Sequence, residues 1–343
     1  MELKELVLKR KNSFRTWMII SAAILIAAAV LALCAGQYQV PVDQVISILM
    51  GKGSTLQNAS KVILQVRLPR ILFSMLAGTG LAAAGTAFQS LFSNPLATPD
   101  TLGTANGASF GAALGILMGF SSAGIQFSAM FFGILAVLLV FAVTRTASSS
   151  NAHSIIMVIL AGLVISSLFS ALVTLTKYVA DPNDILPVIT FWLMGSFSSV
   201  TFKSLQLGAP LILIGVGVLF LLRYRLNAMS LSNDEARSLG INLSLNRGIL
   251  ILCASAITAS IVAVCGVIGW VGLLIPHISR MLFGNDNRRV LPASIVFGAG
   301  FLLITDTIAR CISNAEIPVS ILTAIIGAPV FILLLRRTGG IQV

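Results

Sequence analysis

The chain has 343 residues, of which 57% are hydrophobic and only 10% charged, and its formal net charge is +11. A soluble domain needs about a quarter of its residues charged, so the lipid bilayer must be the main solvent of this protein, and no stretch remains for a soluble catalytic domain. The basic residues flank apolar runs, where membrane topology and anionic lipid explain them, so the charge does not indicate a nucleic-acid partner.

About ten apolar segments are suited to cross a hydrocarbon core about 30 Å thick. They cover residues 17–35, 71–92, 101–119, 125–144, 154–176, 205–223, 248–268, 270–283, 291–311 and 319–335. Most Lys and Arg residues fall in the N-terminal segment 1–16 and in loops that share its side, so by the positive-inside rule that side is cytoplasmic. We therefore expect an all-α polytopic membrane protein, one transmembrane domain over residues 1–343, with both termini in the cytoplasm.

Two stretches do not follow the simple pattern of one long span. The bridge between segments 248–268 and 270–283 is short, but two crossings keep Arg247 and Arg288 on the same face, as the charge rule requires. The apolar patch 185–200 is too short to span once its proline and glycine interrupt it. This patch predicts a short external half-helix.

The longest cytoplasmic connection, residues 224–247, has the signals of a short helix. Ser232 or Asn233 can cap it, an acidic pair follows in the first turn against the positive end of the helix dipole, and Gly240 can end it. We expect this helix to lie parallel to the membrane. By itself the loop is compatible with a solvated connector or with a rigid lever for a cytoplasmic motor.

The sequence lacks the motifs of an enzyme. It has no G-x-x-x-x-G-K-[ST] phosphate loop, and its two histidines, His153 and His277, stand apart from each other without nucleophile or carboxylate partners. The four cysteines lie singly in apolar segments, which is typical of buried small hydrophobic residues. We expect no catalysis, no ATP hydrolysis and no metal site on this chain.

Several motifs recur in a fixed order along almost the whole chain. They are Arg67-Leu-Pro-Arg70, Gln89-x4-Asn94-Pro-Leu-Ala97, Gly103-x3-Gly107-Ala108, the loop from Asp234 to Gly240, Gly269-x-Val-Gly-Leu-x-Ile-Pro-His277-x2-Arg280, Asp306-Thr-x-Ala-Arg310, and Glu316-x-Pro-Val-x2-Leu-Thr-Ala-x2-Gly327-Ala-Pro329. The ordered set resembles the FecCD/BtuC-like permease family of ABC importers, which take up iron-siderophores, haem and cobalamin.

The resemblance implies an assembly in the bacterial plasma (inner) membrane. It implies a ten-span fold and a second permease subunit, either another copy or a related chain, around a central pathway. It also implies two cytoplasmic ATP-binding subunits, which hold the ATP and Mg, and an extracytoplasmic substrate-binding protein. No cofactor is expected on this chain itself.

In that family, arginines on the external face pair with glutamates of the binding protein, and the matching positions here are Arg67, Arg70 and Arg310. Arginine offers fixed bidentate donors to carboxylates, and such charge pairs set docking register and on-rate. The alternative is that these side chains snorkel at span ends. Arg310 has a further alternative, because Asp306 lies one helical turn back and can form an i,i+4 pair with it.

The resemblance also assigns two cytoplasmic or intramembrane groups. The coupling element seated in the ATPase would consist of Asn233, Asp234, Glu235, Ala236, Arg237, Ser238, Leu239, Gly240 and Ile241. The inner gate and the pathway lining would include Asn94, Leu96, Ser154, Ile155, Ser166, Ser167, Ser170 and Thr174. A lining of small, weakly polar groups suits a bulky chelate, whereas Asn94-Pro95 can equally cap a helix end and begin a turn.

The alternative function is an ion-coupled secondary transporter of a small solute. Such proteins keep ionisable residues near the bilayer midplane. The candidates here, Lys177, Asp306 and Glu316, fall near span ends, which favours the importer permease. The cargo, whether a ferric siderophore, haem or cobalamin, is left open because the binding protein usually selects it.

Overall fold

The computed structural model describes residues 2–51, 57–146, 155–231, 233–312 and 316–337, and every regular element in these ranges is helical. The long helices are α1 (Glu2–Cys34), α4 (Leu68–Leu91), α6 (Ser122–Thr146), α7 (Ile155–Val179), α9 (Phe202–Leu221), α12 (Leu243–Cys265), α14 (Asn287–Ile312) and α15 (Val319–Arg337). The shorter ones are α2 (Val42–Leu49), α3 (Gln57–Lys61), α5 (Thr104–Leu117), α8 (Ile185–Leu193), α10 (Arg223–Met229), α11 (Asn233–Ser238) and α13 (Val271–Phe283). A π-helical segment, η2 (Val62–Arg67), and a 3-10 turn, η3 (Pro99–Leu102), complete the set.

Each predicted apolar segment coincides with one helix, from α1 for residues 17–35 to α15 for residues 319–335. Among the described residues, seven helices are long and apolar enough to cross a membrane, and two shorter apolar stretches are α13 and Val319–Leu334 of α15. The all-helical membrane fold is thus confirmed, while the count of ten crossings and the cytoplasmic placement of the termini stay predictions.

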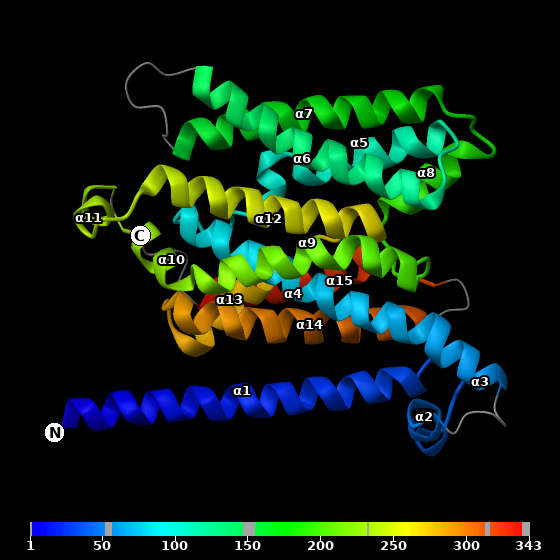
Figure 1. The fold of residues 1–343 in the computed structure, drawn as a ribbon, viewed down its shortest axis with the longest axis horizontal. Coiled ribbons are helices and arrows are strands. Elements are labelled where there is room, and N and C mark those ends of the chain that lie inside the picture. Colours follow the sequence, from blue (N-terminus) through cyan, green and yellow to red (C-terminus); the bar gives the residue numbers. More distant parts are fainter. Residues whose placement is uncertain (1, 52–56, 147–154, 232, 313–315, 338–343) are drawn as a thin grey trace.

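Five of the shorter helices, α2, α3, α8, α10 and α11, lie at the two ends of the bundle. In Figure 1 the beginning of α1, α10 and α11 lie at one end, and α2, α3 and α8 lie at the other. This is the grouping that the charge pattern predicts for a cytoplasmic and an external end. We use these names for the two ends below.

Helices α4 and α12 form the centre of the bundle, whereas α1 runs along its edge (Figure 1). In the most apolar stretch of each helix, 78% of the residues of α4 and 72% of those of α12 are buried, against 11% for α1. Glycines allow the close packing, because a Cβ on Gly78 would lie 2.0 Å from the carbonyl oxygen of Gly298, and one on Gly85 would lie 1.9 Å from that of Gly272.

The second span begins earlier than the sequence predicts. Instead of starting at residue 71, helix α4 continues a helical run through α3 and η2 that extends over Asn58–Leu91. Arg67 and Arg70 lie within this helical run because their guanidinium groups bond to acceptors of the chain itself, Arg67 to the end of α1 and Arg70 to two carboxylates. The π-helical turn, a feature often found at functional sites, lies at this point.

The two stretches that do not follow the pattern of one long span, residues 185–200 and 248–283, form α8 and the pair α12 and α13. The external half-helix is α8, which ends at Leu193 rather than at residue 200, because Gly195 adopts a φ of 68° and packs against the backbone of Val267. Helices α12 and α13 are distinct, and the link between them turns at Gly266 and Trp270, which have φ values of 73° and 71°. Two helices in this region are therefore confirmed.

Candidate functional site

Arg67 fastens the end of α1 to the beginning of the second span. Its Nη1 donates hydrogen bonds to the carbonyl oxygens of Leu33 (2.6 Å) and Cys34 (3.3 Å), and its Nη2 donates to that of Tyr38. Leu33 and Cys34 lie in the last turn of α1, where carbonyl groups lack helical partners and attract cations. The guanidinium therefore caps α1 and holds the connection that follows it.

Arg70 is the centre of a buried ion triad. Its Nε and Nη2 donate to the Asp306 carboxylate at 2.7–3.0 Å, and its Nη1 donates to both carboxylate oxygens of Glu316 at 2.8 and 2.9 Å. The side chains of Arg70 and Asp306 are 5% and 0% exposed, and that of Glu316 is 34% exposed. The triad joins α4 to α14 and to the segment that leads into α15.

Arg310 makes no hydrogen bond or close ion pair with Asp306, so the i,i+4 pair that the sequence offered as an alternative does not form in this structure. Its Nη2 donates instead to the carbonyl oxygen of Ala32 and, at 3.4 Å, to the hydroxyl of Thr307. Asp306 turns toward Arg70, which offers it three hydrogen bonds from another helix. Arg67 and Arg310 thus both reach the last turns of α1 from different helices.

We call Arg67, Arg70, Arg310, Asp306 and Glu316 together the external clamp. The three arginines are 4–5% exposed in the chain by itself, so their guanidinium groups are not an open surface. The expectation of outward-facing arginines therefore fails for this conformation, because the chain supplies its own acceptors. Whether they also dock a binding protein stays a prediction. Such docking would need an incoming carboxylate to reach Arg70 beside Glu316, the exposed member of its triad.

A cavity of about 400 Å³ opens beside Glu316 at the external end. Aromatic and hydroxyl side chains line it, among them Phe191 and Trp192 of α8 and Ser196 and Ser198 after it. The loop after α8 is held in place by the hydrogen bond from the Ser196 nitrogen to the Cys265 carbonyl (2.8 Å). The cavity brings the end of the half-helix next to the external clamp.

At the cytoplasmic end, the loop contains the short helix that the sequence predicts. Helix α11 spans Asn233–Ser238 and is followed by a turn at Gly240. Gly240 has a φ of 74°, and its nitrogen donates a hydrogen bond to the Arg237 carbonyl (2.9 Å). Ala236 is buried and Ile241 packs against the main core, whereas Leu239 is 62% exposed. The helix is thus anchored on one side and exposes its other side to solvent. Ser232 lies outside the described residues, and the coupling role of residues 233–241 stays a prediction.

The predicted pathway residues of α7 divide between two faces. Ser167, Ser170 and Thr174 are exposed, but Ser166 accepts a hydrogen bond from Asn106 Nδ2 at 2.6 Å and so turns toward α5. Ser154 lies outside the described residues, and Ile155 begins the helix. The weakly polar face of α7 therefore consists of Ser167, Ser170 and Thr174, and its role in transport stays a prediction.

Asn94 and Leu96 lie in the turn after α4. The Asn94 carboxamide oxygen accepts a hydrogen bond from the Leu96 nitrogen (2.9 Å), so Asn94 does begin a turn, and the Leu96 side chain is 47% exposed. Asn94 also lines a cytoplasmic cavity of about 390 Å³ with Arg280 and Asp286. The sequence did not indicate this cavity, because its walls come from α4, α10 and the link between α13 and α14.

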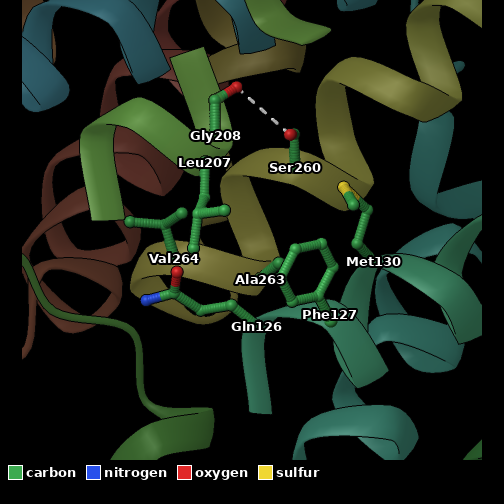
Figure 2. Close-up of a pocket in the computed structure, with 8 residues that line it drawn as sticks. All are labelled: Gln126, Phe127, Met130, Leu207, Gly208, Ser260, Ala263 and Val264. Carbon is green, nitrogen blue, oxygen red and sulfur yellow. Dashed lines mark hydrogen bonds between the residues drawn. The ribbon is translucent and has the colours of Figure 1, made fainter. Parts of the chain in front are cut away.

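A third hollow, between α6, α9 and α12, is too small for cargo (Figure 2). Its volume of about 10 Å³ is room for one water molecule at most. Two polar side chains on its wall bond to neighbours: Gln126 Nε2 donates to Ser204 Oγ, and Ser260 Oγ donates to the Gly208 carbonyl, both at 3.2 Å. The other lining side chains drawn in Figure 2 are mostly apolar. This hollow therefore offers no room for a ligand.

Comparison with known proteins gives consistent matches over nearly the whole chain. Residues 24–337 match the FecCD transport family. A molybdate import permease, MolB of Haemophilus influenzae, is 42% identical over 90% of this chain and 91% of its own length. The vitamin B12 import permease BtuC of Klebsiella pneumoniae is 35% identical over 95% of each chain. A solved metal-chelate type ABC transporter in an inward-facing conformation has a TM-score of 0.87, 39% identity, and coverage of 94% of this chain and 99% of its own.

Proposed function

This chain belongs to the FecCD transport family and is a permease subunit of an ABC importer in the inner membrane, and we propose that its cargo is a ferric siderophore or a related metal chelate. It would move this cargo into the cytoplasm by alternating access. The observation that supports the proposal most strongly is the similarity, over nearly the full chain, to a metal-chelate type transporter.

The ionisable residues of the bundle argue against the ion-coupled alternative. Both carboxylates in the external clamp, Asp306 and Glu316, accept hydrogen bonds from Arg70. A coupling carboxylate has to bind and release its ion during each cycle, so an arginine that donates two or three hydrogen bonds to it would hinder this exchange. These acids therefore fit a structural role.

The cargo is tested through ligand binding. We expect the cognate binding protein to bind a ferric siderophore, haem or cobalamin in a calorimetric titration. Molybdate belongs in the same series, because the Haemophilus influenzae relative is named for it. Binding of molybdate with no binding of any chelate would overturn the proposed cargo and leave the family assignment unchanged.

For the assembly, we propose a second permease subunit, two ATP-binding subunits that carry ATP and Mg, and an extracytoplasmic binding protein. Helix α11 would transmit the motion of the ATPase, with the exposed Leu239 as its apolar contact. The Leu239→Asp variant should then lose the co-purifying ATPase. Leu245→Asp, at a residue that is 58% exposed near the beginning of α12, is the matched control and should keep it. Equal behaviour of the two variants would reduce α11 to a connector.

For the binding protein, we propose docking at the external clamp, with an acidic side chain of the partner approaching Arg70. Glu316 would compete for this guanidinium, so Glu316→Gln should tighten docking. Asp184→Asn removes an exposed acidic group near the start of α8 and controls for general electrostatics. If both variants changed the affinity equally, or neither did, Arg70 would be a purely internal residue. The measurement is the affinity of the binding protein for the reconstituted complex.

A further inference from the structure

A cavity of about 260 Å³ lies at the cytoplasmic end, between α1 and the link from α13 to α14. Two aromatic side chains of α1, Phe14 and Trp17, form one wall, and Phe283 and Arg289 belong to the other. The cavity can hold far more than a single water molecule. It is separate from the external clamp, from the face of α7 and from α11.

The two walls meet through an aromatic contact. The ring of Phe14 stands edge-on to that of Phe283, with centroids 5.1 Å apart, and Phe283 also contacts Phe297 at 6.2 Å. Trp17 is 57% exposed beside them. Tryptophan has an apolar ring and a polar N–H, and it is enriched at the depth of the lipid headgroups. Since α1 is the edge helix, the cavity faces the lipid.

Arg289 brings a positive charge without an acidic partner among the described residues. The nearest acid along the chain, Asp286, accepts hydrogen bonds from Arg288 Nε (2.9 and 3.0 Å) and from Asn227 Nδ2 (2.7 Å) instead. The hydroxyl of Ser13 lines the same cavity. A guanidinium with a neighbouring hydroxyl presents the donors that a phosphate group needs.

We infer that this cavity binds the headgroup of an anionic phospholipid from the cytoplasmic leaflet, with its phosphate on Arg289 and its glycerol region against Phe14 and Trp17. The negative surface potential of that leaflet concentrates such lipids at basic residues. Bound lipid would hold the edge helix α1, in whose most apolar stretch only 11% of the residues are buried, against α13 and α14.

The test is native mass spectrometry of the transporter complex during titration with phosphatidylglycerol or phosphatidylcholine. We expect phosphatidylglycerol to bind in preference, and Arg289→Gln to weaken it by about tenfold, as the loss of one charge-assisted bond predicts. Arg289→Lys keeps the charge but loses the planar guanidinium, so its affinity for phosphatidylglycerol should lie between those of the wild type and Arg289→Gln. Arg336→Gln, at an exposed residue near the end of α15, is the matched control and should bind as the wild type does.

Three results would overturn the inference. One is equal binding of the two lipids, and another is equal weakening by Arg289→Gln and Arg336→Gln, which would mean general surface attraction. The third is displacement of phosphatidylglycerol by millimolar inorganic phosphate, which would indicate an anion site rather than a lipid site. Thermal unfolding of each variant in parallel separates loss of binding from loss of fold.

Discussion

Replacing Asp306 by Ala would leave the Arg70 guanidinium, in a side chain that is 5% exposed, with Glu316 as its single carboxylate partner. Asp306 accepts three of the five hydrogen bonds that Arg70 donates within the triad. Removing one partner of a buried pair typically costs about 3–5 kcal/mol, because the remaining charge is uncompensated. Since Glu316 still holds Arg70, we expect about 3 kcal/mol, at the lower end of this range.

The assay is denaturant unfolding of the purified chain in detergent, followed by circular dichroism. Glu316→Gln is the comparison, and it should cost about 1 kcal/mol, because its carboxylate is partly exposed and screened. A triple variant with Arg70→Met, Asp306→Leu and Glu316→Gln should recover most of the stability that Asp306→Ala loses, since apolar side chains replace the two buried charges and a neutral one replaces the partly exposed charge.

The expectation is contradicted if Asp306→Ala lowers the free energy of unfolding by no more than Glu316→Gln does. In that case the buried carboxylate would contribute little, and the external clamp would not hold α4 and α14 together. A triple variant less stable than Asp306→Ala would also contradict it, because packing would then depend on the charges themselves.

Two further predictions concern packing and pH. Gly78→Ala should destabilise the chain by about 1–3 kcal/mol, because its Cβ would lie 2.0 Å from the Gly298 carbonyl oxygen. Gly217→Ala in α9 should be neutral or stabilising, because its Cβ would meet no neighbouring atom within 4 Å outside its own helix turn. Unfolding curves measure both variants, and equal effects would exclude direct contact of α4 and α14. Partial burial raises the pKa of Asp286, but hydrogen bonds from Arg288 and Asn227 outweigh this effect and hold the pKa below its ordinary value. The stability that the Asp286 carboxylate contributes is therefore fully present above the ordinary pKa near 4, and it is lost as pH falls through the lowered pKa. The difference in unfolding free energy between wild type and Asp286→Asn should shrink on acidification. A difference that is independent of pH would exclude a stabilising role for the Asp286 carboxylate.

The apolar pattern predicted the helices well, because each span needs its own run of hydrophobic residues whatever its neighbours are. The turn at Gly240 and the short helix before it could also be predicted, since capping and termination depend on residues close in sequence. The same holds for the turn at Asn94, whose side chain bonds two residues ahead.

The surroundings of the arginines could not be predicted in this way. Arg70 finds Asp306 and Glu316 at sequence separations of 236 and 246 residues, and no local pattern links them. The available signal was the acid itself, because a carboxylate inside an apolar helix needs a buried cation. Likewise, the direction of Ser166 depends on Asn106 of α5, so only the packed bundle distinguishes it from the exposed Ser167.

We propose that ATP hydrolysis by partner subunits drives uptake through this chain. The most direct test is uptake of a labelled ferric siderophore into proteoliposomes that contain the chain, its ATPase subunits and its binding protein. We predict uptake that requires ATP, is unaffected by a protonophore, and is lost in the Leu239→Asp variant but not in Leu245→Asp. Uptake that persists without ATP and collapses with the protonophore would instead show an ion-coupled transporter.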